Sequence, residues 1–259
     1  MTHPTPLLSD LLVSWHKVAD GCNTPEMRIS ELEASPVLPL PARCVPRQAW
    51  RNGSTIFGER TLAEEVPVAF SYDGAAHAVL MATPDDLEDF ALGFSYTEGI
   101  ITAPAEIAEL AVLSVADGIV LRMWLTGERS DAFAARRRRF VGPAGCGMCG
   151  LESLAEANRA IPMARCGLQV GRQEIAEVVA ALPAGQLLNM QTRAVHAAAF
   201  WRPDQDLVLR EDIGRHNALD KLAGALLRTS WSAADGVIVL SSRISIELVQ
   251  KAAMMGRRS

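Results

Sequence analysis

Loose alternation of apolar and polar residues predicts the first strands of the chain. The segment VPVAFSYDGAAHAVLMA, residues 66–82, alternates on both sides of the dipeptide Asp73-Gly74. An Asp-Gly pair between two alternating runs is typical of a tight hairpin turn. The later segment GIVLRMWLTG, residues 118–127, has the composition of a further strand. We therefore expect a hairpin and one more strand in the N-terminal half of the chain.

Helical spacing replaces this alternation directly after the predicted hairpin. Residues 83–101 carry apolar side chains at intervals of three and four residues, namely Leu87, Phe90, Ala91 and Phe94. Thr83 is suited to cap a helix here, and Pro84 suits its first position. Gly99 is the expected end. The segment therefore predicts a helix that buries one face.

Predicted helices and strands alternate in the second half of the chain. The expected helices cover residues 151–161, 174–182, 216–229 and 245–255. The expected strands cover residues 194–200, 206–212 and 236–242. The last strand, GVIVLSS, is a continuous apolar run, which is typical of a strand covered on both faces. The alternation of strand and helix predicts an α/β layer with parallel strand pairing.

Proline and glycine divide the chain into four segments. Seven of the 14 prolines lie in the first 46 residues, so residues 1–54 are expected to form an irregular extension. Residues 55–141 should form a subdomain of strands and helix, and residues 153–259 an α/β subdomain. Residues 142–152, between them, form a glycine-rich loop with two cysteines. We therefore expect an α/β fold with a smaller N-terminal α+β subdomain.

Composition and charge are those of a globular protein without nucleic-acid or membrane partners. Apolar residues make up 49% and charged residues 21% of the 259 residues. With a net charge of −5, the chain lacks the excess of positive charge that is typical of nucleic-acid-binding proteins. No run approaches the about 18 apolar residues of a membrane span, and PLLSDLLVSW lacks the basic flank of a signal peptide. With five cysteines, an odd number, we expect a cytoplasmic protein with reduced thiols.

Two cysteines three positions apart, Cys146 and Cys149, are the first candidates for chemistry. Their segment, GPAGCGMCGLES, offers half of a zinc site, but tetrahedral zinc needs two further ligands. The candidates for these ligands, without a second CxxC or an HxxxH motif, are Cys166, His196 and His216. A zinc deaminase would also need a His-x-Glu motif, whereas Ala198 stands at the position of the glutamate. Structural zinc is therefore the weaker alternative, and no permanent metal is expected.

The same cysteines are compatible with redox or sulfur-transfer chemistry. A thiol–disulfide oxidoreductase uses CxxC with a lowered thiol pKa, although thioredoxin-like proteins place this motif early in the chain. A thiolate in a glycine loop is also able to accept sulfur as a persulfide. The arginine run at residues 136–139 and the following helix start would both favour the thiolate. Because Cys146 lies between glycines and nearer these arginines, we assign it as the sulfur carrier and expect Cys149 to assist.

A second candidate site combines two turns that lead from a strand into a helix. The segment REDIGRHNALDK, residues 210–221, concentrates charged side chains where a helix begins, and helix starts bind anions through free N–H groups. The segment SSRIS, residues 241–245, is a similar turn after the next strand. The candidate donors to a phosphate or a base edge are Arg215, His216, Asn217, Lys221 and Arg243. His196, on its apolar strand, fits a core histidine and a ligand contact equally well.

Together these motifs resemble one protein family. GCGMCG, VHAAAF, REDIGRHNALDKLAG and SRISIELVQKAA, with ATPDDLEDFALGFSYTEGII upstream, are similar to segments of the FdhD family of formate dehydrogenase accessory sulfurtransferases. The resemblance implies that a cysteine desulfurase places sulfur on a cysteine of the CGxC loop. The sulfur then passes to the bis-molybdopterin guanine dinucleotide cofactor, bound as a substrate, and formate dehydrogenase becomes active. The resemblance also implies a cytidine-deaminase-like layered fold and a homodimer.

Some positions depart from the family pattern. Where family members read T-G-G-x-H, this chain has Arg193 and Ala194, and their S-G-R is Ser241-Ser242-Arg243. Family members continue past the QKAA helix with another strand, so we expect the α/β subdomain to be short at its C-terminal end. A CxxC oxidoreductase and a non-catalytic chaperone that binds the molybdenum cofactor remain as alternative functions.

Overall fold

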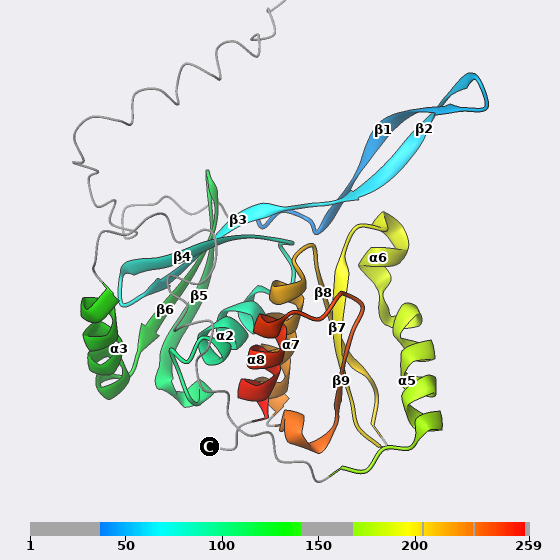
Figure 1. Cartoon of the computed structure of the whole chain (residues 1–259). Coiled ribbons are helices and arrows are strands. Elements are labelled where there is room, and N and C mark those ends of the chain that lie inside the picture. Colours follow the sequence, from blue (N-terminus) through cyan, green and yellow to red (C-terminus); the bar gives the residue numbers. More distant parts are fainter. Residues whose placement is uncertain (1–36, 141–167, 204, 230, 257–259) are drawn as a thin grey trace, which may run out of the picture.

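The strands in the described part of the chain form three sheets (Figure 1). The structure, a computed structural model, describes residues 37–140, 168–203, 205–229 and 231–256. The strands within them are β1 Ala42–Arg51, β2 Ser54–Ala63, β3 Val66–Tyr72, β4 Ala75–Ala82, β5 Ile107–Val115, β6 Gly118–Leu125, β7 His196–Trp201, β8 Val208–Asp212 and β9 Val237–Leu240. Their orders in the sheets are β1-β2, β4-β3-β6-β5 and β8-β7-β9.

Helices accompany the two larger sheets. They are α2 Leu87–Thr97, α3 Gly127–Phe140, α5 Arg172–Gly185, α6 Leu187–Thr192, α7 Arg215–Thr229 and α8 Ile246–Met255, with the short 3-10 helices η3 Pro104–Glu106 and η4 Ala233–Asp235. This mixture of sheets and helices confirms the predicted α/β class. The finer expectation, a cytidine-deaminase-like layering, stays a prediction.

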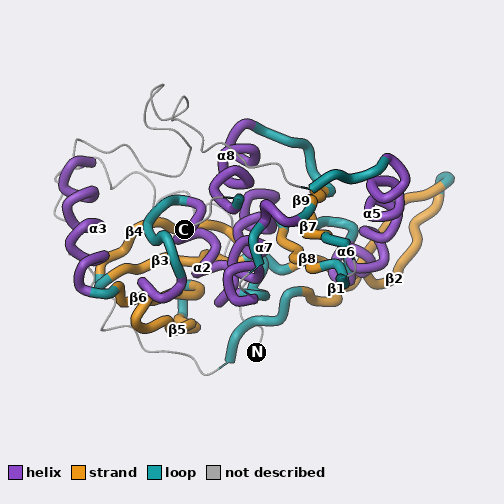
Figure 2. The backbone as a smooth tube through the Cα atoms, turned by 90° about the horizontal axis from the view of Figure 1, so that it is seen from below, coloured by secondary structure: helices purple, strands orange, loops and turns teal. Residues whose placement is uncertain are grey.

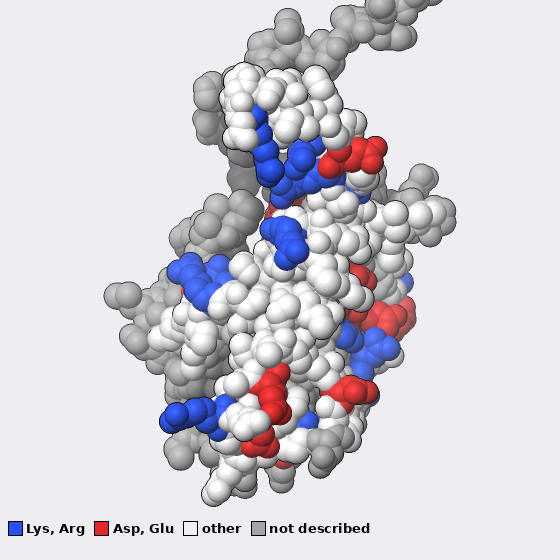
Figure 3. Space-filling model, turned by 90° about the vertical axis from the view of Figure 1, so that its right-hand side faces the viewer, with Lys and Arg blue, Asp and Glu red and all other residues white. Residues whose placement is uncertain are grey.

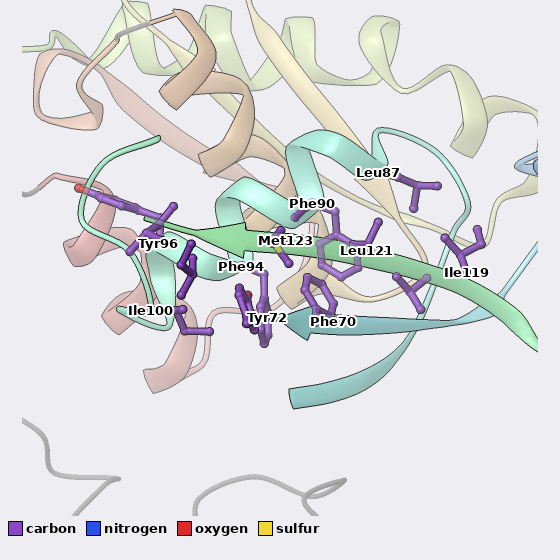
Figure 4. Close-up of a cluster of buried hydrophobic side chains, with 14 of the residues drawn as sticks. Phe70, Tyr72, Leu87, Phe90, Phe94, Tyr96, Ile100, Ile119, Leu121 and Met123 are labelled. Carbon is purple, nitrogen blue, oxygen red and sulfur yellow. The ribbon is translucent and has the colours of Figure 1, made fainter. Parts of the chain in front are cut away.

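The four-stranded sheet packs one face against α2 and encloses the larger hydrophobic core (Figure 4). β3 pairs antiparallel with β4 across Asp73 and Gly74, whose positive φ values of 52° and 78° suit a tight hairpin turn. β3 also pairs parallel with β6, the predicted third strand. The ring of Phe70 lies 5.0 Å from that of Phe90 and 4.1 Å from that of Phe94, centroid to centroid. The predicted hairpin and strand are therefore confirmed. The prediction that the helix buries only one face is wrong, because nearly every residue of α2 is buried between the four-stranded sheet and α7.

The start of α2 differs from the prediction. The helix begins after Asp86, which has a left-handed conformation with φ 50°, and not at Pro84. Thr83 does not cap it, because its hydroxyl oxygen Oγ1 accepts a hydrogen bond from the backbone N–H of Ile213 at 3.2 Å, and its own N–H donates to Asp212 Oδ2 at 3.0 Å. The residues that the local pattern assigned to the first turn of the helix are therefore held by contacts with the end of β8, in the three-stranded sheet. The end of the helix at Gly99, with φ 68°, is as predicted.

The three-stranded sheet is antiparallel throughout, which corrects the predicted parallel pairing. β7 lies in the middle and pairs antiparallel with both β8 and β9. β8 and β9 run in the same direction, but β7 occupies the place between them, so the connection through α7 crosses over one strand. The side chains that α7 and α8 bury against this sheet include Leu219, Leu222 and Leu248. All four residues of β9 are only half-buried, so the predicted cover on both of its faces is wrong as well.

Helices α5 and α6 lie beside the three-stranded sheet, at the opposite end of the molecule from α3 (Figure 1). α5 contains the helix predicted at residues 174–182 and buries Val178 and Leu182. α3 ends at Phe140, so the arginine run of residues 136–139 belongs to a helix. The cysteine loop and the helix predicted at residues 151–161 lie outside the described residues.

β1 and β2 form an arm that projects from the rest of the molecule (Figure 1, Figure 2). The two strands pair without interruption around Asn52 and Gly53, whose φ values of 50° and 79° fit a tight hairpin turn. The arm corrects the irregular extension predicted for residues 1–54, of which residues 1–36 lie outside the described part. Pro46 is compatible with β1 because a two-stranded ribbon has open edges, where proline is tolerated in strands.

Two glycines allow α2 and α7 to touch through their backbones. A Cβ on Gly93 would lie 1.7 Å from the carbonyl oxygen of Asp220, and a Cβ on Gly224 would lie 1.9 Å from that of Asp89. Any larger residue would have to push the helices apart, because a packed interior leaves no space for it. α2 also packs on the four-stranded sheet and α7 on the three-stranded sheet, so this contact joins the two halves.

Gly224→Ala should destabilise the protein by about 1–3 kcal/mol, because its methyl group would overlap rigid backbone. Thermal unfolding followed by circular dichroism would show this as a lower Tm. Gly58→Ala is the matched control and should leave the Tm nearly unchanged, since no atom lies within 4 Å of its Cβ position. Equal Tm values for Gly224→Ala and the unmodified protein would contradict a backbone contact between α2 and α7.

Candidate functional site

The described residues contain the second predicted site, at the starts of two helices. Cys146 and Cys149, the predicted sulfur-carrying pair, lie outside the described residues. The turns that lead from β8 into α7 and from β9 into α8 are described. Because β8 and β9 flank β7 and run in the same direction, α7 and α8 begin at the same edge of the sheet.

Asp212, the last residue of β8, fixes the turn into α7. Its side chain is fully buried. Oδ1 accepts hydrogen bonds from the backbone N–H of Gly214 at 2.7 Å and from Asn217 Nδ2 at 2.9 Å. Oδ2 accepts from the backbone N–H of Thr83 at 3.0 Å and lies 2.7 Å from Lys221 Nζ. One carboxylate therefore shapes the start of α7 and ties it to the end of β4.

Lys221 and Asn217 are structural residues, which corrects their prediction as cofactor contacts. Lys221 is fully buried, and besides Asp212 its ammonium group donates to the carbonyl oxygen of Thr83 at 2.9 Å. Asn217 Nδ2 donates to the carbonyl oxygen of Met81 at 2.8 Å as well as to Asp212. Buried charges and amides require such partners, and these partners direct both side chains into the protein.

His216 and Glu247 connect the starts of α7 and α8. His216 Nε2 lies 3.2 Å from Glu247 Oε2, and Ser245 Oγ donates to the same oxygen at 3.0 Å. Burial and the neighbouring Arg215 guanidinium lower the pKa of His216. The hydrogen bond from Ser245, followed by that from His216, lowers the pKa of Glu247. At neutral pH a neutral imidazole therefore donates its Nε2–H to an ionised carboxylate.

His196 and Arg243 lie at the same edge of the sheet as these helix starts. β7 pairs with β9, and the pairing continues past β9 because Ser241 exchanges two hydrogen bonds with Ala197. The N–H of Ser241 donates to the carbonyl oxygen of Ala197 at 3.0 Å, and its hydroxyl accepts from the Ala197 N–H at 2.7 Å. This pairing brings His196, the first residue of β7, beside the turn that carries Arg243. His196 is half-buried and Arg243 is exposed.

A buried network holds α8 in place. Lys251 Nζ lies 2.9 Å from both carboxylate oxygens of Asp220, 2.7 Å from Glu98 Oε1 and 3.0 Å from Thr97 Oγ1. Burial alone would lower the pKa of Lys251, but attraction to Asp220 and Glu98 outweighs it and raises this pKa. Lys251 therefore stays charged at neutral pH. The network links α8 to α7 and α2, and so determines where Glu247 stands.

The surface between the two helix starts is suited to an anionic group. Arg215 is half-buried and Arg243 exposed, and the first N–H groups of α7 and α8 lie at helix ends that favour anions. Glu247 adds an ionised acceptor for N–H groups. The described part of the chain holds no group of three or more His, Cys, Asp or Glu side chains that could bind a metal ion. None of the described helices is both long and apolar enough to cross a membrane.

Sequence reasoning did not single out Asp212, Ser241 or Glu247. A signal for Asp212 was its position two residues before a turn glycine, because an Asp side chain accepts a hydrogen bond from the backbone two residues on. A signal for Glu247 was its place just after the start of a predicted helix, where acidic residues are favoured. The role of Ser241 depends on the pairing of β7 with β9, which the sequence did not reveal.

Comparisons with known proteins agree with the motifs. A model of the FdhD/NarQ family matches residues 63–258. A protein described as sulfur carrier protein FdhD from Agrobacterium fabrum is 49% identical over 83% of this chain and 80% of its own. Its counterpart from Brucella abortus is 48% identical over 83% of this chain and 81% of its own. The crystal structure of a proposed formate dehydrogenase accessory protein from Desulfotalea psychrophila has a TM-score of 0.63 at 24% identity, over 84% of this chain and 81% of its own.

Two substitutions should move the pKa of His216 in opposite directions. Glu247→Gln removes a carboxylate that favours the protonated imidazole, so the pKa should fall further. Arg215→Ala removes a cation that disfavours the protonated imidazole, so the pKa of His216 should rise. Nuclear magnetic resonance titration of the imidazole measures both effects. Glu109→Gln, at a carboxylate of β5, is the control and should change nothing; shifts of the same sign in Glu247→Gln and Arg215→Ala would contradict this geometry.

Proposed function

The chain belongs to the FdhD/NarQ family, and from this we propose that it carries sulfur. The observation that supports the proposal most directly is its 49% identity to a sulfur carrier protein over 83% of the chain. Cys146 and Cys149 lie within the residues that the family model matches. We propose a cysteine desulfurase as the sulfur donor, a formate dehydrogenase as the enzyme that is served, and the cytoplasm as the compartment.

The proposed transfer starts at the thiolate of Cys146. This thiolate attacks the outer sulfur of the donor's persulfide, an S–S bond forms on Cys146, and the donor's thiolate leaves without net oxidation. For release, the thiolate of Cys149 attacks the inner sulfur of the new persulfide. The outer sulfur leaves as hydrosulfide, and the Cys146–Cys149 disulfide that remains is reduced by a cellular thiol. The two cysteines thereby deliver sulfur to an acceptor and return to their first state.

We propose the bis-molybdopterin guanine dinucleotide cofactor as the acceptor, bound as a substrate at the starts of α7 and α8. Phosphate groups are recognised by cations and helix N–H groups, which Arg215, Arg243 and the two helix starts offer. The ionised Glu247 is an acceptor for the N–H groups of a guanine edge. His196 and His216 border the same surface, whereas the buried Asn217 and Lys221 no longer belong to the proposed contacts.

Cys146→Ala should abolish sulfur loading, and Cys149→Ala should retain it. Each variant would be incubated with a cysteine desulfurase and cysteine, and intact-mass spectrometry would detect the gain of one sulfur atom. Activation of formate dehydrogenase, measured in parallel, should be lost in Cys146→Ala and reduced in Cys149→Ala.

The control for loading is Cys44→Ala, which removes an exposed thiol on β1 and should leave loading unchanged. Loading of Cys146→Ala but not of Cys149→Ala would reverse the assignment of the carrier. Enzyme activation by a double variant that lacks both cysteines would contradict sulfur carriage by this pair, and a disulfide-exchange activity without sulfur gain would indicate an oxidoreductase.

His216→Ala and Arg243→Ala should each weaken the binding of GDP, used as a probe of the guanine dinucleotide. A lost hydrogen bond to a charged group costs about 1.5–3 kcal/mol, which corresponds to a roughly tenfold to hundredfold higher Kd. Isothermal titration calorimetry measures the change. Arg47→Ala, at an exposed arginine of the arm, is the matched control and should bind GDP normally. Unchanged affinity in both site variants would place the nucleotide elsewhere.

A further inference from the structure

The pair of His216 and Glu247, at the starts of α7 and α8, leaves two acceptor atoms without a partner. His216 Nε2 lies 3.2 Å from Glu247 Oε2, and the same oxygen accepts a hydrogen bond from Ser245 Oγ at 3.0 Å. Within the described residues, neither Nδ1 of His216 nor Oε1 of Glu247 has a hydrogen-bond partner. Both atoms are therefore available to a ligand.

The hydrogen bond to Glu247 fixes the tautomer of His216. A neutral imidazole carries one N–H group and one lone pair, and the carboxylate of Glu247 holds the N–H group on Nε2. Burial and the Arg215 guanidinium lower the pKa of His216, so the ring is neutral at neutral pH. Nδ1 therefore presents a lone pair, and a group that binds to it has to be a hydrogen-bond donor.

Nδ1 of His216 is reachable from the surface. The side chain of His216 is 32% exposed, and that of Glu247 is 41% exposed. In the described part of the chain, the buried side-chain atoms that lack a partner are Ser71 Oγ and the Nε atoms of Arg122, Arg202 and Arg215. The unpartnered Nδ1 is not one of these buried atoms, so it is in contact with solvent.

Two arginines on the same surface also have unused hydrogen-bonding groups. The guanidinium groups of Arg215 and Arg243 make no ion pair or hydrogen bond with any other described residue. A guanidinium donates N–H groups and accepts none, so it is suited to phosphate oxygens. The surface thus combines unpaired cationic donors with unpaired acceptors. A ligand that satisfies both has an anionic part and, apart from it, N–H or O–H groups.

This combination distinguishes a nucleotide from a simple anion. Inorganic phosphate would pair with the arginines but would leave the lone pair of His216 and Oε1 of Glu247 unused. A nucleotide carries phosphates at one end, and N–H groups on its base or hydroxyl groups on its ribose at the other. By contrast, Figure 3 shows a broad uncharged area on the side of the molecule that carries α5 and α6.

We propose that Nδ1 of His216 accepts a hydrogen bond from the nucleoside part of the bound ligand, while the phosphates lie at Arg215 and Arg243. The inference rests on the proposed nucleotide surface and adds the direction of binding, since His216 selects for a donor group and not for a phosphate. Glu247 and Ser245 also act through His216, because they hold its ring in this tautomer and orientation. Both a guanine N–H and a ribose hydroxyl are able to supply the donor.

Two amide substitutions of His216 separate the roles of its nitrogens. His216→Asn places an amide oxygen where Nδ1 stands, whereas His216→Gln places an amide group where Nε2 stands and nothing at Nδ1. Isothermal titration calorimetry with GDP as the probe should give a Kd within about threefold of the unmodified protein for His216→Asn and about tenfold higher for His216→Gln. His77→Gln, the same substitution at an exposed position of β4, is the matched control and should bind GDP normally. Thermal unfolding checks that each variant folds.

Acidification tests whether Nδ1 accepts or donates. Arg215 and Lys251 face the imidazole and disfavour its protonation, whereas Glu247 favours it. Protonation puts a second N–H group on the ring and removes the lone pair, so the donor of the ligand loses its partner. From about pH 7.5 to about pH 5, the Kd of GDP should therefore rise more for the unmodified protein than for His216→Asn, whose amide does not titrate. Protonation of the GDP phosphates affects both proteins alike. A smaller rise than in His216→Asn would indicate an imidazolium that contacts phosphate, and would overturn the proposal.

Two analogues of GDP identify the donor. ADP lacks the N–H groups that guanine carries on N1 and N2, and 2′,3′-dideoxy-GDP lacks both ribose hydroxyls. For the analogue without the donor, the ratio of the Kd of His216→Gln to that of the unmodified protein should fall to about one. A ratio that stays at about tenfold for both analogues, or equal GDP affinities of His216→Asn and His216→Gln, would contradict the proposal. Weaker GDP binding by Arg243→Ala would then still support the proposed nucleotide surface, and sulfur loading of Cys146 has its own measurement.

Discussion

The close contact between α2 and α7 is the constraint on which the rest of the structure depends. Gly93 and Gly224 let the two helices meet backbone to backbone. α2 covers the four-stranded sheet and α7 covers the three-stranded sheet, so their separation sets the position of one half against the other. Packed helices transmit even small displacements, because an interior at crystal-like density has little room to absorb them. This contact therefore also fixes the position of the helix starts that form the candidate site.

Buried charges specify the geometry around that contact. Asp212 with Lys221 joins β8 and α7 to the end of β4, and Asp220 with Lys251 joins α7 to α8. Buried ion pairs contribute little net stability, because desolvation offsets their attraction. Stability therefore comes chiefly from the two apolar clusters, in which burial removes hydrocarbon from water. The ion pairs instead favour one arrangement of the helices, since any other arrangement would leave a buried charge without its partner.

The polar motif at the start of α7 consequently serves two purposes. Its inward-facing members, Asp212, Asn217 and Lys221, hold the turn in shape. Its partly exposed members, Arg215 and His216, remain available at the surface, where His216 meets Glu247 of α8. The proposed nucleotide surface thus lies above buried, hydrogen-bonded polar residues that fix its shape.

The sequence by itself determined the elements whose signals are local. The Asp73-Gly74 turn follows from backbone conformations that these residues tolerate, and the helices follow from apolar residues at helical spacing. The cysteine pair and its proposed chemistry also came from the sequence alone, because thiol chemistry is a property of residue type.

Only the tertiary structure decided the rest. A strand–helix–strand pattern looks the same whether or not β7 lies between β8 and β9. A lysine in a polar motif is an equally good donor to a ligand or to a buried carboxylate, and only packing places Lys221 against Asp212. Proline density around Pro46 indicated irregular chain, because a local pattern does not contain the partner strand that makes β1 a strand.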